Sequence, residues 1–298
     1  MSQLPVAYVA EYSRNLYDLA AQKTSKLSPC VDLDTMNGEK AFFEQVGSVA
    51  AVEKTQRYPD TPLVETPFER RMVVPKQYHI ADLVDNLDEV QLMIEPRSPI
   101  IRRQVESLNR RKDKLIISAF DADALTGHDG GTVVPFPTSQ EIPVDLSGAN
   151  EGLTIDKLIE AKSLFGKNDV DIEDPDNQLF MGTTQAQLDD LLRTTQVTSS
   201  DYNTIKALVR GELDTYLGFK FVRTELFEFE QNSSVRKCFA WAKSGMKYAT
   251  LKNITGDIGI RRDKSIAWQM YAVMAGNALR MEESKVVRVL CDENPTTP

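Results

Sequence analysis

The residues best placed to bind a metal form a run of carboxylates near the middle of the chain. Its members are Asp169, Asp171, Glu173, Asp174 and Asp176. Oxygen ligands at alternating positions suit a hard cation such as calcium. The run nevertheless lacks the glycine and the final glutamate that an EF-hand loop requires, and Pro175 stiffens it. We therefore interpret it as a solvated acidic loop, and a soluble two-domain enzyme with a carboxylate or metal site here is the alternative.

The remaining candidates for catalysis are weaker. His79 and His128 are far apart in the sequence, so the chain contains no sequential histidine pair. The Gly127–Gly131 segment, which holds a histidine next to an aspartate, is typical of a plain turn. The Ser163–Lys167 segment lacks the first glycine of a phosphate-binding loop, and we expect Gly166 to end a helix in the left-handed conformation. The sequence predicts no catalytic residue, cofactor or metal site.

The composition is that of an ordinary folded protein. The 298 residues include 35 basic and 44 acidic side chains, and 41% are hydrophobic, which suits about two domains. The net charge of −9 argues against a protein that binds nucleic acid through its whole surface. No stretch reaches the roughly 18 apolar residues of a membrane span, and the first residues do not resemble a signal peptide. We expect a soluble, mildly acidic protein made in the cytoplasm.

Two strand-like stretches near the N-terminus indicate a long hairpin. Ala41–Glu53 and Glu69–Ile80 are rich in Val, Phe and Met, and the prolines around Asp60 signal a turn between them. The outer part has too few large apolar residues for a core of its own, and an isolated two-stranded hairpin is marginally stable in water. We expect it to lie against another surface, of its own chain or of a neighbouring one, and a floppy loop is the alternative. The preceding Val6–Ala21 has a helical apolar stripe and leads into residues without a clear period, as an arm would.

The strongest helix signal covers residues 98–120. Ser98 and Pro99 form an N-cap and first-turn pair, and apolar residues recur at heptad-like spacing from Ile101 onward. The opposite face is basic, with Glu106 and Asp113 as its acids. Its cations are Arg97, Arg102, Arg103, Arg110, Arg111, Lys112 and Lys114. Such a face is usually solvated or pairs with carboxylates of neighbouring chains; binding to nucleic acid or to a membrane is the alternative.

Residues 125–225 have the pattern of a separate, acidic α/β unit. Thr154 caps one expected helix, Thr184 with Gln187 is a capping-box pattern that opens another at Gln185–Arg193, and a short helix is expected at Ser200–Leu208. The expected strands of this unit and of the C-terminal third are Leu179–Met181, Gly218–Val222, Lys237–Ala242, Ile266–Ala275 and Val286–Cys291. The pattern predicts an α+β fold in which the acidic unit is inserted into a platform of the basic helix and the last strands.

Several stretches of the sequence are distinctive as a set. They are Asp60–Pro67 through Ala81–Asp85, Ser200–Val209, Gly211–Phe219, Ala240–Ser244, and Arg280–Glu283 before Val286-Val287. Together they resemble the major capsid proteins of tailed bacteriophages of the Hong Kong 97 type, over about residues 40 to 292. None of them is a catalytic motif, so the resemblance implies a structural protein and not an enzyme.

The resemblance implies the capsid fold of that family. Residues 1–40 would be the N-terminal arm and 41–80 the E-loop hairpin, which in the family lies over the adjacent subunit. Residues 81–124 and 226–298 would be the peripheral domain, with the spine helix at 98–120, and 125–225 the axial domain. The implied function is self-assembly into pentamers and hexamers of an icosahedral shell that encloses packaged double-stranded DNA.

The resemblance also implies partners and a location. The first residues lack the long charged helical extension that serves some members as a built-in scaffold, so we expect a separate scaffolding protein, with a portal and decoration proteins as further partners. The packaged DNA would be contacted non-specifically, and no membrane partner is expected. The protein would be assembled in the host cytoplasm and reside in the virion capsid.

The resemblance directs attention to three groups of residues. For contact between subunits we select Lys54, Arg57, Asp60 and Glu65 of the hairpin, and for charge pairing or DNA contact we select Arg102, Arg103, Arg110 and Arg111 of the helix. Some relatives form a lysine–asparagine cross-link, for which Lys54 with Asn253 or Asn277 are the candidates, but we expect non-covalent packing. We also expect Cys30, Cys238 and Cys291 to be buried reduced thiols, and an inter-chain disulfide from Cys30 is the alternative.

Overall fold

The computed structural model describes residues 22–57, 60, 63–85, 97–172, 174, 177–193, 215–231 and 233–294. The helices expected at Val6–Ala21 and Ser200–Leu208 lie outside these residues. The chain divides into two compact units. The first includes Gln77–Arg111 and Lys252–Ala275, and the second includes Ser25–Lys76, Lys112–Leu251 and the residues from Gly276 onward. The division falls inside one long helix and two long strands, each of which contributes to both units.

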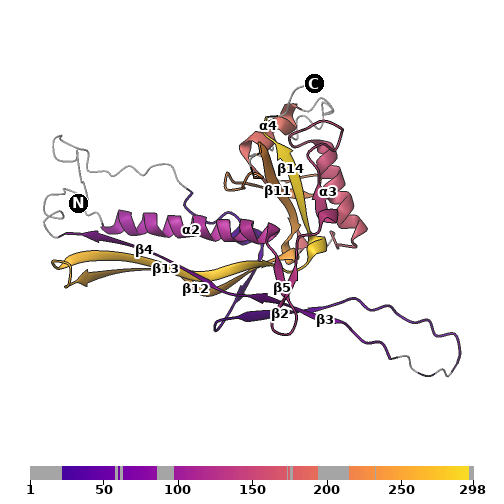
Figure 1. The fold of residues 1–298 in the computed structure, drawn as a ribbon, viewed down its shortest axis with the longest axis horizontal. Coiled ribbons are helices and arrows are strands. Elements are labelled where there is room, and N and C mark those ends of the chain that lie inside the picture. Colours follow the sequence, from indigo (N-terminus) through magenta and orange to yellow (C-terminus); the bar gives the residue numbers. More distant parts are fainter. Residues whose placement is uncertain are drawn as a thin grey trace. The chain divides into compact units, whose positions relative to one another are not determined.

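The first unit combines the start of helix α2 (Arg97–Asp121) with long strands. Strands β12 (Met246–Arg261), β13 (Ala267–Arg280) and β4 (Lys76–Val84) are neighbours in one sheet in that order, and they run alongside the helix (Figure 1). A Cβ atom at Gly256 would lie 2.8 Å from the end of the Ile101 side chain, so a larger residue at this position of β12 would have to displace Ile101 of the helix. Helix α2 extends one residue beyond the expected range 98–120 at each end.

Strand β12 is the longest of the elements that the sequence pattern did not predict. Its 16 residues include Gly256, Asp257 and Gly259, which are disfavoured in strands, and lysines that interrupt the apolar alternation. Its neighbour β13 is longer than the expected Ile266–Ala275 and ends at Arg280. Pairing between long neighbouring strands outweighs the weak local propensity of β12, which is why a single-sequence pattern does not reveal it.

The second unit is built on a six-stranded sheet with helices α3 (Ile155–Lys167) and α4 (Gln185–Arg193) (Figure 1). The strand order is β7 (Glu141–Ile142), β14 (Val286–Asp292), β11 (Val235–Ala242), β8 (Leu179–Thr183), β10 (Phe219–Arg223) and β9 (Thr215–Tyr216). Every residue of β8 is buried, as expected for a central strand covered on both faces. Leu158 and Phe165 of α3 and Leu188 of α4 belong to the same core cluster as Met181 of β8.

The six-stranded sheet combines strands from two segments of the chain that were expected to belong to different domains. The expected axial segment 125–225 supplies β7, β8, β9 and β10, but β11 and β14 come from the C-terminal segment expected in the peripheral domain. β11 pairs with β8 from Phe239 opposite Gly182 to Ala242 opposite Leu179. The sheet of the acidic segment is therefore completed by C-terminal strands, whose continuous apolar runs need burial on both faces.

The caps expected for α3 and α4 are present, whereas α2 begins at Arg97, so Ser98 lies inside that helix and not at its N-cap. The Thr154 side chain accepts from the Lys157 amide at the start of α3, and the Thr184 amide donates to Gln187 Oε1 at 2.9 Å before α4. The prediction for Gly166 was wrong, because α3 continues through this residue to Lys167 and the positive φ of 52° belongs to Asp169. Within the described residues, no helix is long and apolar enough to cross a membrane.

The hairpin of the second unit starts from a four-stranded sheet. Its strands, in spatial order, are β2 (Ala41–Val46), β3 (Phe68–Val73), β5 (Ala124–Thr126) and β6 (Thr132–Val134). The expected strand Glu69–Ile80 is divided at Pro75, which has no amide hydrogen for a ladder, so that β3 and β4 belong to different sheets. The Gly127–Gly131 segment is the turn between β5 and β6, as expected, and His128 and Asp129 on it are exposed.

Candidate assembly interface

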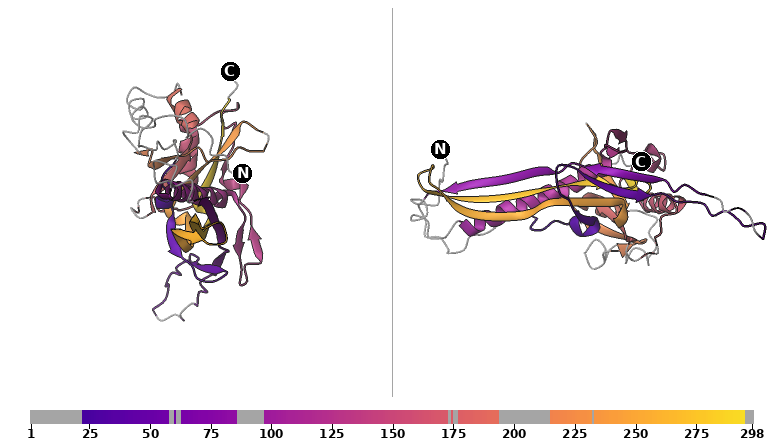
Figure 2. Two further views of the ribbon diagram at one scale, coloured as in Figure 1. Left: turned by 90° about the vertical axis from the view of Figure 1, so that its left-hand side faces the viewer. Right: turned by 90° about the horizontal axis from the view of Figure 1, so that it is seen from below.

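The hairpin continues past its ladder into an extended, exposed segment. The β2–β3 register ends at Val46 opposite Phe68, and the Gly47 amide then donates to the Pro67 carbonyl at 2.8 Å. A Cβ atom at Gly47 would lie 2.6 Å from Pro67 Cγ, so glycine is required where the two arms meet. We call the described residues 47–57, 60 and 63–67 the outer hairpin. Figures 1 and 2 show it running away from β2 and β3.

The outer hairpin exposes apolar side chains. Leu63 is 98% exposed, and Val49, Val52 and Val64 are each at least half exposed. Val46 and Phe68 at the ends of the ladder are exposed as well. Large apolar side chains gathered on one exposed segment indicate a surface that another molecule covers. Sequence reasoning selected only charged residues here and missed this group, although the adjacent Leu63 and Val64 stand out in a polar, proline-rich stretch.

The four residues selected for subunit contact all lie on the outer hairpin. Lys54, Arg57, Asp60 and Glu65 are exposed. Exposed charged side chains thus accompany exposed apolar ones on the same segment, a mixture found in protein–protein contacts.

The base of the hairpin is fixed to the body of the second unit by a buried arginine. Arg71 of β3 is 4% exposed, and its Nε donates to the Met281 carbonyl at 3.1 Å while Nη2 lies 2.7 Å from Glu283 Oε2. Gln45 of β2 also donates to the Met281 carbonyl. Both strands of the hairpin are thus bonded to the connection between β13 and β14.

A second buried arginine joins the same connection to the end of helix α2. Arg280 is 1% exposed and donates to the carbonyls of Phe120 and Ala122, both at 2.8 Å, and to the Val134 carbonyl at 3.3 Å. Its Nε lies 3.5 Å from Glu283 Oε1. Burial lowers the pKa of Arg280, but bonds to the carbonyls at the helix C-terminus and the nearby carboxylate favour the charged form. We call Arg71, Arg280 and Glu283 the hairpin joint.

A further set of ion pairs surrounds the joint. Asp121, the last residue of α2, pairs with Lys237 of β11 at 2.7 Å and with Arg288 of β14, which also pairs with Glu141. These ion pairs join the end of α2, to which Arg280 of the joint is bonded, to three strands of the six-stranded sheet. The sequence analysis assigned no role to any member of the joint or of this set, although the stretch Arg280–Glu283 was among those that carry the family resemblance.

The basic face of α2 is partly engaged within the first unit. Arg103 pairs with Glu106 at 2.8 Å, and Arg111 donates to the Tyr78 hydroxyl at 3.0 Å with its guanidinium 4.5 Å from the ring centre. Arg102 and Arg110 are exposed. The four selected arginines therefore do not act as one free patch, because two of them already make specific contacts in their own chain.

The acids of α2 were assigned to the wrong face. We expected Glu106 and Asp113 on the charged side, but both are buried, and Asp113 is 0% exposed. Asp113 accepts from the Ser25 hydroxyl at 2.5 Å and from the amides of Lys26 and Leu27 at 3.1 and 3.3 Å. This carboxylate fixes the residues that precede strand β1 (Asp32–Thr35), which pairs in parallel with β12. In the sequence, the only indication that Asp113 is buried is its position next to the apolar stripe of the helix.

The three cysteines are buried, and none is paired within the chain. Burial raises the pKa of the Cys30 thiol to about 11, so that little of it is in the reactive thiolate form at neutral pH. A hydrogen bond to Cys291, together with burial, raises the pKa of the Cys238 thiol as well. These positions suit structural thiols more than an inter-chain disulfide.

The other candidates from the sequence are not brought into one site. Asp169, Asp171 and Asp174 line a shallow cavity with Lys285, and Glu173 and Asp176 lie outside the described residues. Among the described residues, no three His, Cys, Asp or Glu side chains are grouped so that they could hold a metal ion. Asn277 donates to the Val74 carbonyl at 2.9 Å, and Asn253 is exposed on β12 in the other unit.

Comparison with known proteins decides the family. A family model described as "Phage capsid protein" matches residues 4–293. The chain belongs to this family. It is a major capsid protein of the Hong Kong 97 type, a subunit of an icosahedral phage shell. No curated protein matches the sequence significantly.

Solved structures share the fold at low sequence identity. The capsid of Ralstonia phage GP4 matches with a TM-score of 0.73 at 11% identity, covering 100% of both chains. The capsid of cyanophage Pam1 matches with a TM-score of 0.73 at 10% identity, covering 98% of this chain and 99% of the other. The SrpI encapsulin of Synechococcus elongatus matches with a TM-score of 0.59 at 12% identity, covering 97% and 94%. Since an encapsulin shares the fold, the family match and not the fold identifies this chain as a phage protein.

Proposed function

We propose that copies of this capsid protein join as hexamers and pentamers through the outer hairpin, which lies on a neighbouring copy. The observation that carries this proposal is the contrast between the two ends of the hairpin. Its base is held by Arg71 and the rest of the joint, whereas Leu63 and its apolar neighbours are exposed. A hairpin with a fixed base and an exposed apolar end is suited to bind another chain. Because the joint already restricts the orientation of the hairpin, less conformational entropy is lost on binding.

The partners and location follow from this role. The shell encloses double-stranded DNA, contacted non-specifically by exposed arginines such as Arg102 and Arg110, and it is assembled in the host cytoplasm with a separate scaffolding protein, a portal and decoration proteins. The exposed position of both arginines and the family membership support this part of the proposal.

The role is structural and not catalytic. In the alternative of a carboxylate or metal enzyme, Asp169, Asp171 and Asp174 would have to converge on an ion, and they are not grouped in that way. In the alternative of a basic-helix nucleic-acid-binding protein, the arginines of α2 would face a ligand together, but Arg103 and Arg111 contact Glu106 and Tyr78 instead.

The test is assembly of the expressed protein with and without the outer hairpin. We expect shells or ring-shaped capsomers of the full chain in sucrose gradients and negative-stain images. Replacement of residues 48–66 by a short Gly-Ser turn should give a folded chain that no longer assembles. A full chain that stays monomeric at high concentration would contradict the proposal, and a shortened chain that still forms shells would show that the hairpin is not the contact.

A further inference from the structure

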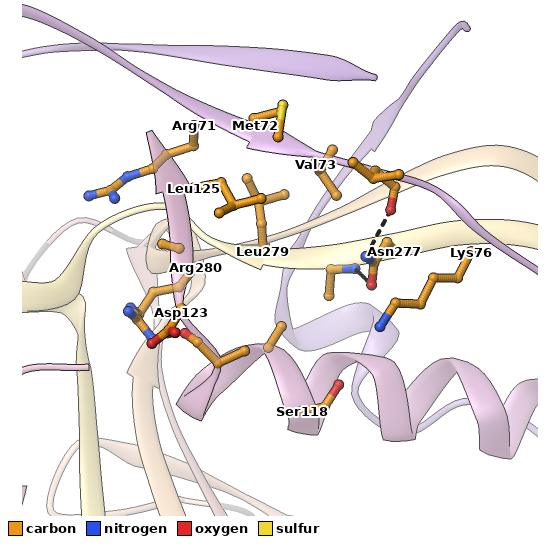
Figure 3. Close-up of a pocket in the computed structure, with 15 residues that line it drawn as sticks. Arg71, Met72, Val73, Lys76, Ser118, Asp123, Leu125, Asn277, Leu279 and Arg280 are labelled. Atoms are coloured by element: carbon orange, nitrogen blue, oxygen red, sulfur yellow. Dashed lines mark hydrogen bonds between the residues drawn. The ribbon is translucent and has the colours of Figure 1, made fainter. Parts of the chain in front are cut away.

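A cavity of about 300 Å³ lies at the base of the hairpin in the second unit. Its walls come from β3, the C-terminal end of α2, β5 and β13, and Figure 3 shows Met72, Val73, Leu125 and Leu279 around it. Lys76 and Asn277 lie together at one end, and the guanidinium groups of Arg71 and Arg280 lie at the other. The cavity is thus mainly apolar, with a lysine ammonium on one side.

We propose that this cavity is the socket for the outer hairpin of a second copy, with Leu63 and Val64 entering it and Glu65 pairing with Lys76. The proposal rests on the proposed function, since it names the surface of the neighbouring subunit that receives the hairpin. Leu63 and Val64 are two adjacent large apolar residues that are exposed on the outer hairpin, and Glu65 follows them directly. Lys76 is exposed at the edge of the cavity, so the charges are complementary.

The same chain cannot fill its own socket. Between Gly47 and Pro67 each arm has about ten residues, which reach roughly 33 Å when extended. The hairpin runs away from β2 and β3, and the cavity is lined by β3, so the outer hairpin points away from the cavity of its own chain (Figures 1 and 2). A partner that carries both the apolar pair and the following carboxylate at the necessary spacing is another copy of this chain.

The arrangement also explains why the contact closes rings. The projecting residues and the socket are different surfaces of one chain, so each copy can receive one neighbour and insert into the next. Such a head-to-tail contact produces a closed ring when the rotation per subunit fits, whereas a contact between identical surfaces would stop at a dimer.

Disulfide trapping tests the socket directly. Leu63→Cys is combined with Ser118→Cys, because Ser118 is exposed on α2 and lines the cavity. The control combines Leu63→Cys with Val133→Cys, an exposed position on β6 outside the cavity. Assembled particles are oxidised with copper phenanthroline and separated on non-reducing gels. We expect a reducible ladder of multimers from the Ser118 pair and mainly monomer from the control.

Charge reversal provides an independent measurement. Glu65→Lys and Lys76→Glu should each reduce the yield of assembled particles severalfold, and the double reversal should restore most of it. Exposed positions were chosen so that the variants fold, which circular dichroism verifies. Shells that form normally without a Ser118-specific ladder, or a double reversal no better than either single change, would overturn the socket while leaving the hairpin contact intact. A wild-type chain that forms no particles would contradict the proposed function instead.

Discussion

Arg71 and Glu283 are 212 residues apart in the sequence and form an ion pair of 2.7 Å in which the arginine side chain is buried. The pair joins β3 of the hairpin to the connection between β13 and β14. Removing one partner of a buried pair leaves the other charge without compensation, which costs far more than the loss of an exposed pair. The orientation of the hairpin therefore depends on a contact between its base and the C-terminal strands.

Arg71→Met should loosen the hairpin and weaken assembly. We expect the unfolding free energy of the second unit to fall by about 3 kcal/mol, because Glu283 and the Met281 carbonyl each lose one of two partners and keep only Arg280 and Gln45. The measurements are urea unfolding and the yield of particles. Arg70→Met is the matched control, since Arg70 is the preceding residue and pairs with Glu44 at the surface. Equal effects of the two changes would contradict the role of the joint.

Asp113→Asn should release the segment before β1. The aspartate accepts three bonds, from Ser25, Lys26 and Leu27, and an asparagine offers one acceptor oxygen and a second group that can only donate. We expect a loss of about 1–3 kcal/mol in unfolding free energy and faster tryptic cleavage at Lys23 and Lys26. Asp123→Asn, at an exposed residue just past the end of α2, is the control and should change neither quantity. Unchanged cleavage in the Asp113 variant would show that the carboxylate does not hold this segment.

The sequence predicts elements whose signals are local. Helix α2 and the caps Thr154 and Thr184 depend on residues within one or two turns, and the structure has them at the expected places. Strand β12 is held by neighbouring strands and not by its own composition, so its pattern gave no signal. The resemblance to capsid proteins identified the family, and the family match confirms it.

The joint could not be predicted because its residues are far apart in the sequence and are of common types that form no recognisable motif. Nothing near Arg71 in the sequence distinguishes it from Arg70, which is exposed on the same strand. Their different surroundings follow from the alternation of the two faces of β3 and from the arrival of Glu283. The selected hairpin residues Lys54, Arg57, Asp60 and Glu65 are exposed as a contact requires, but their role in the assembled shell stays a prediction.

Acid should destabilise the second unit through Glu293. Burial alone would raise the pKa of this carboxyl, but the ion pair with Arg236 and the Gln187 amide, 3.1 Å away, hold it below its usual value of 4.5. A carboxyl with a lowered pKa in the folded state contributes stability that is present above pH 4.5 and is lost as the pH falls through the folded value.

The expected result is a melting temperature that is constant near pH 6 and falls below about pH 4.5, with a shallower fall for Glu293→Gln. The glutamine variant should also melt lower than the wild type at pH 7, because it cannot form the ion pair. Glu228→Gln changes an exposed carboxylate nearby in the sequence and should reproduce the wild-type curve. If Glu293→Gln and the wild type lost stability in parallel with falling pH, the acid effect would lie elsewhere.

Lys157→Met should disrupt the loop that precedes α3. Lys157 is 0% exposed, and its ammonium contacts the carbonyls of Val144, Glu151, Gly152 and Leu290 at distances of 2.9 to 3.1 Å. Burial lowers the pKa of this lysine, and no carboxylate is among these four contacts, so the carbonyl oxygens stabilise the charge. Methionine fills a similar volume but removes one donor from each of the four carbonyls, of which those of Val144 and Glu151 keep a backbone amide donor. We expect a loss of about 3 kcal/mol in unfolding free energy. Lys162→Met, at an exposed position of the same helix, is the control. Because the four carbonyls belong to the loop and to β14, amide hydrogen exchange should become faster at residues 144–152 and at the end of β14 in the Lys157 variant alone. Exchange rates that are the same in both variants would show that the ammonium does not organise this loop.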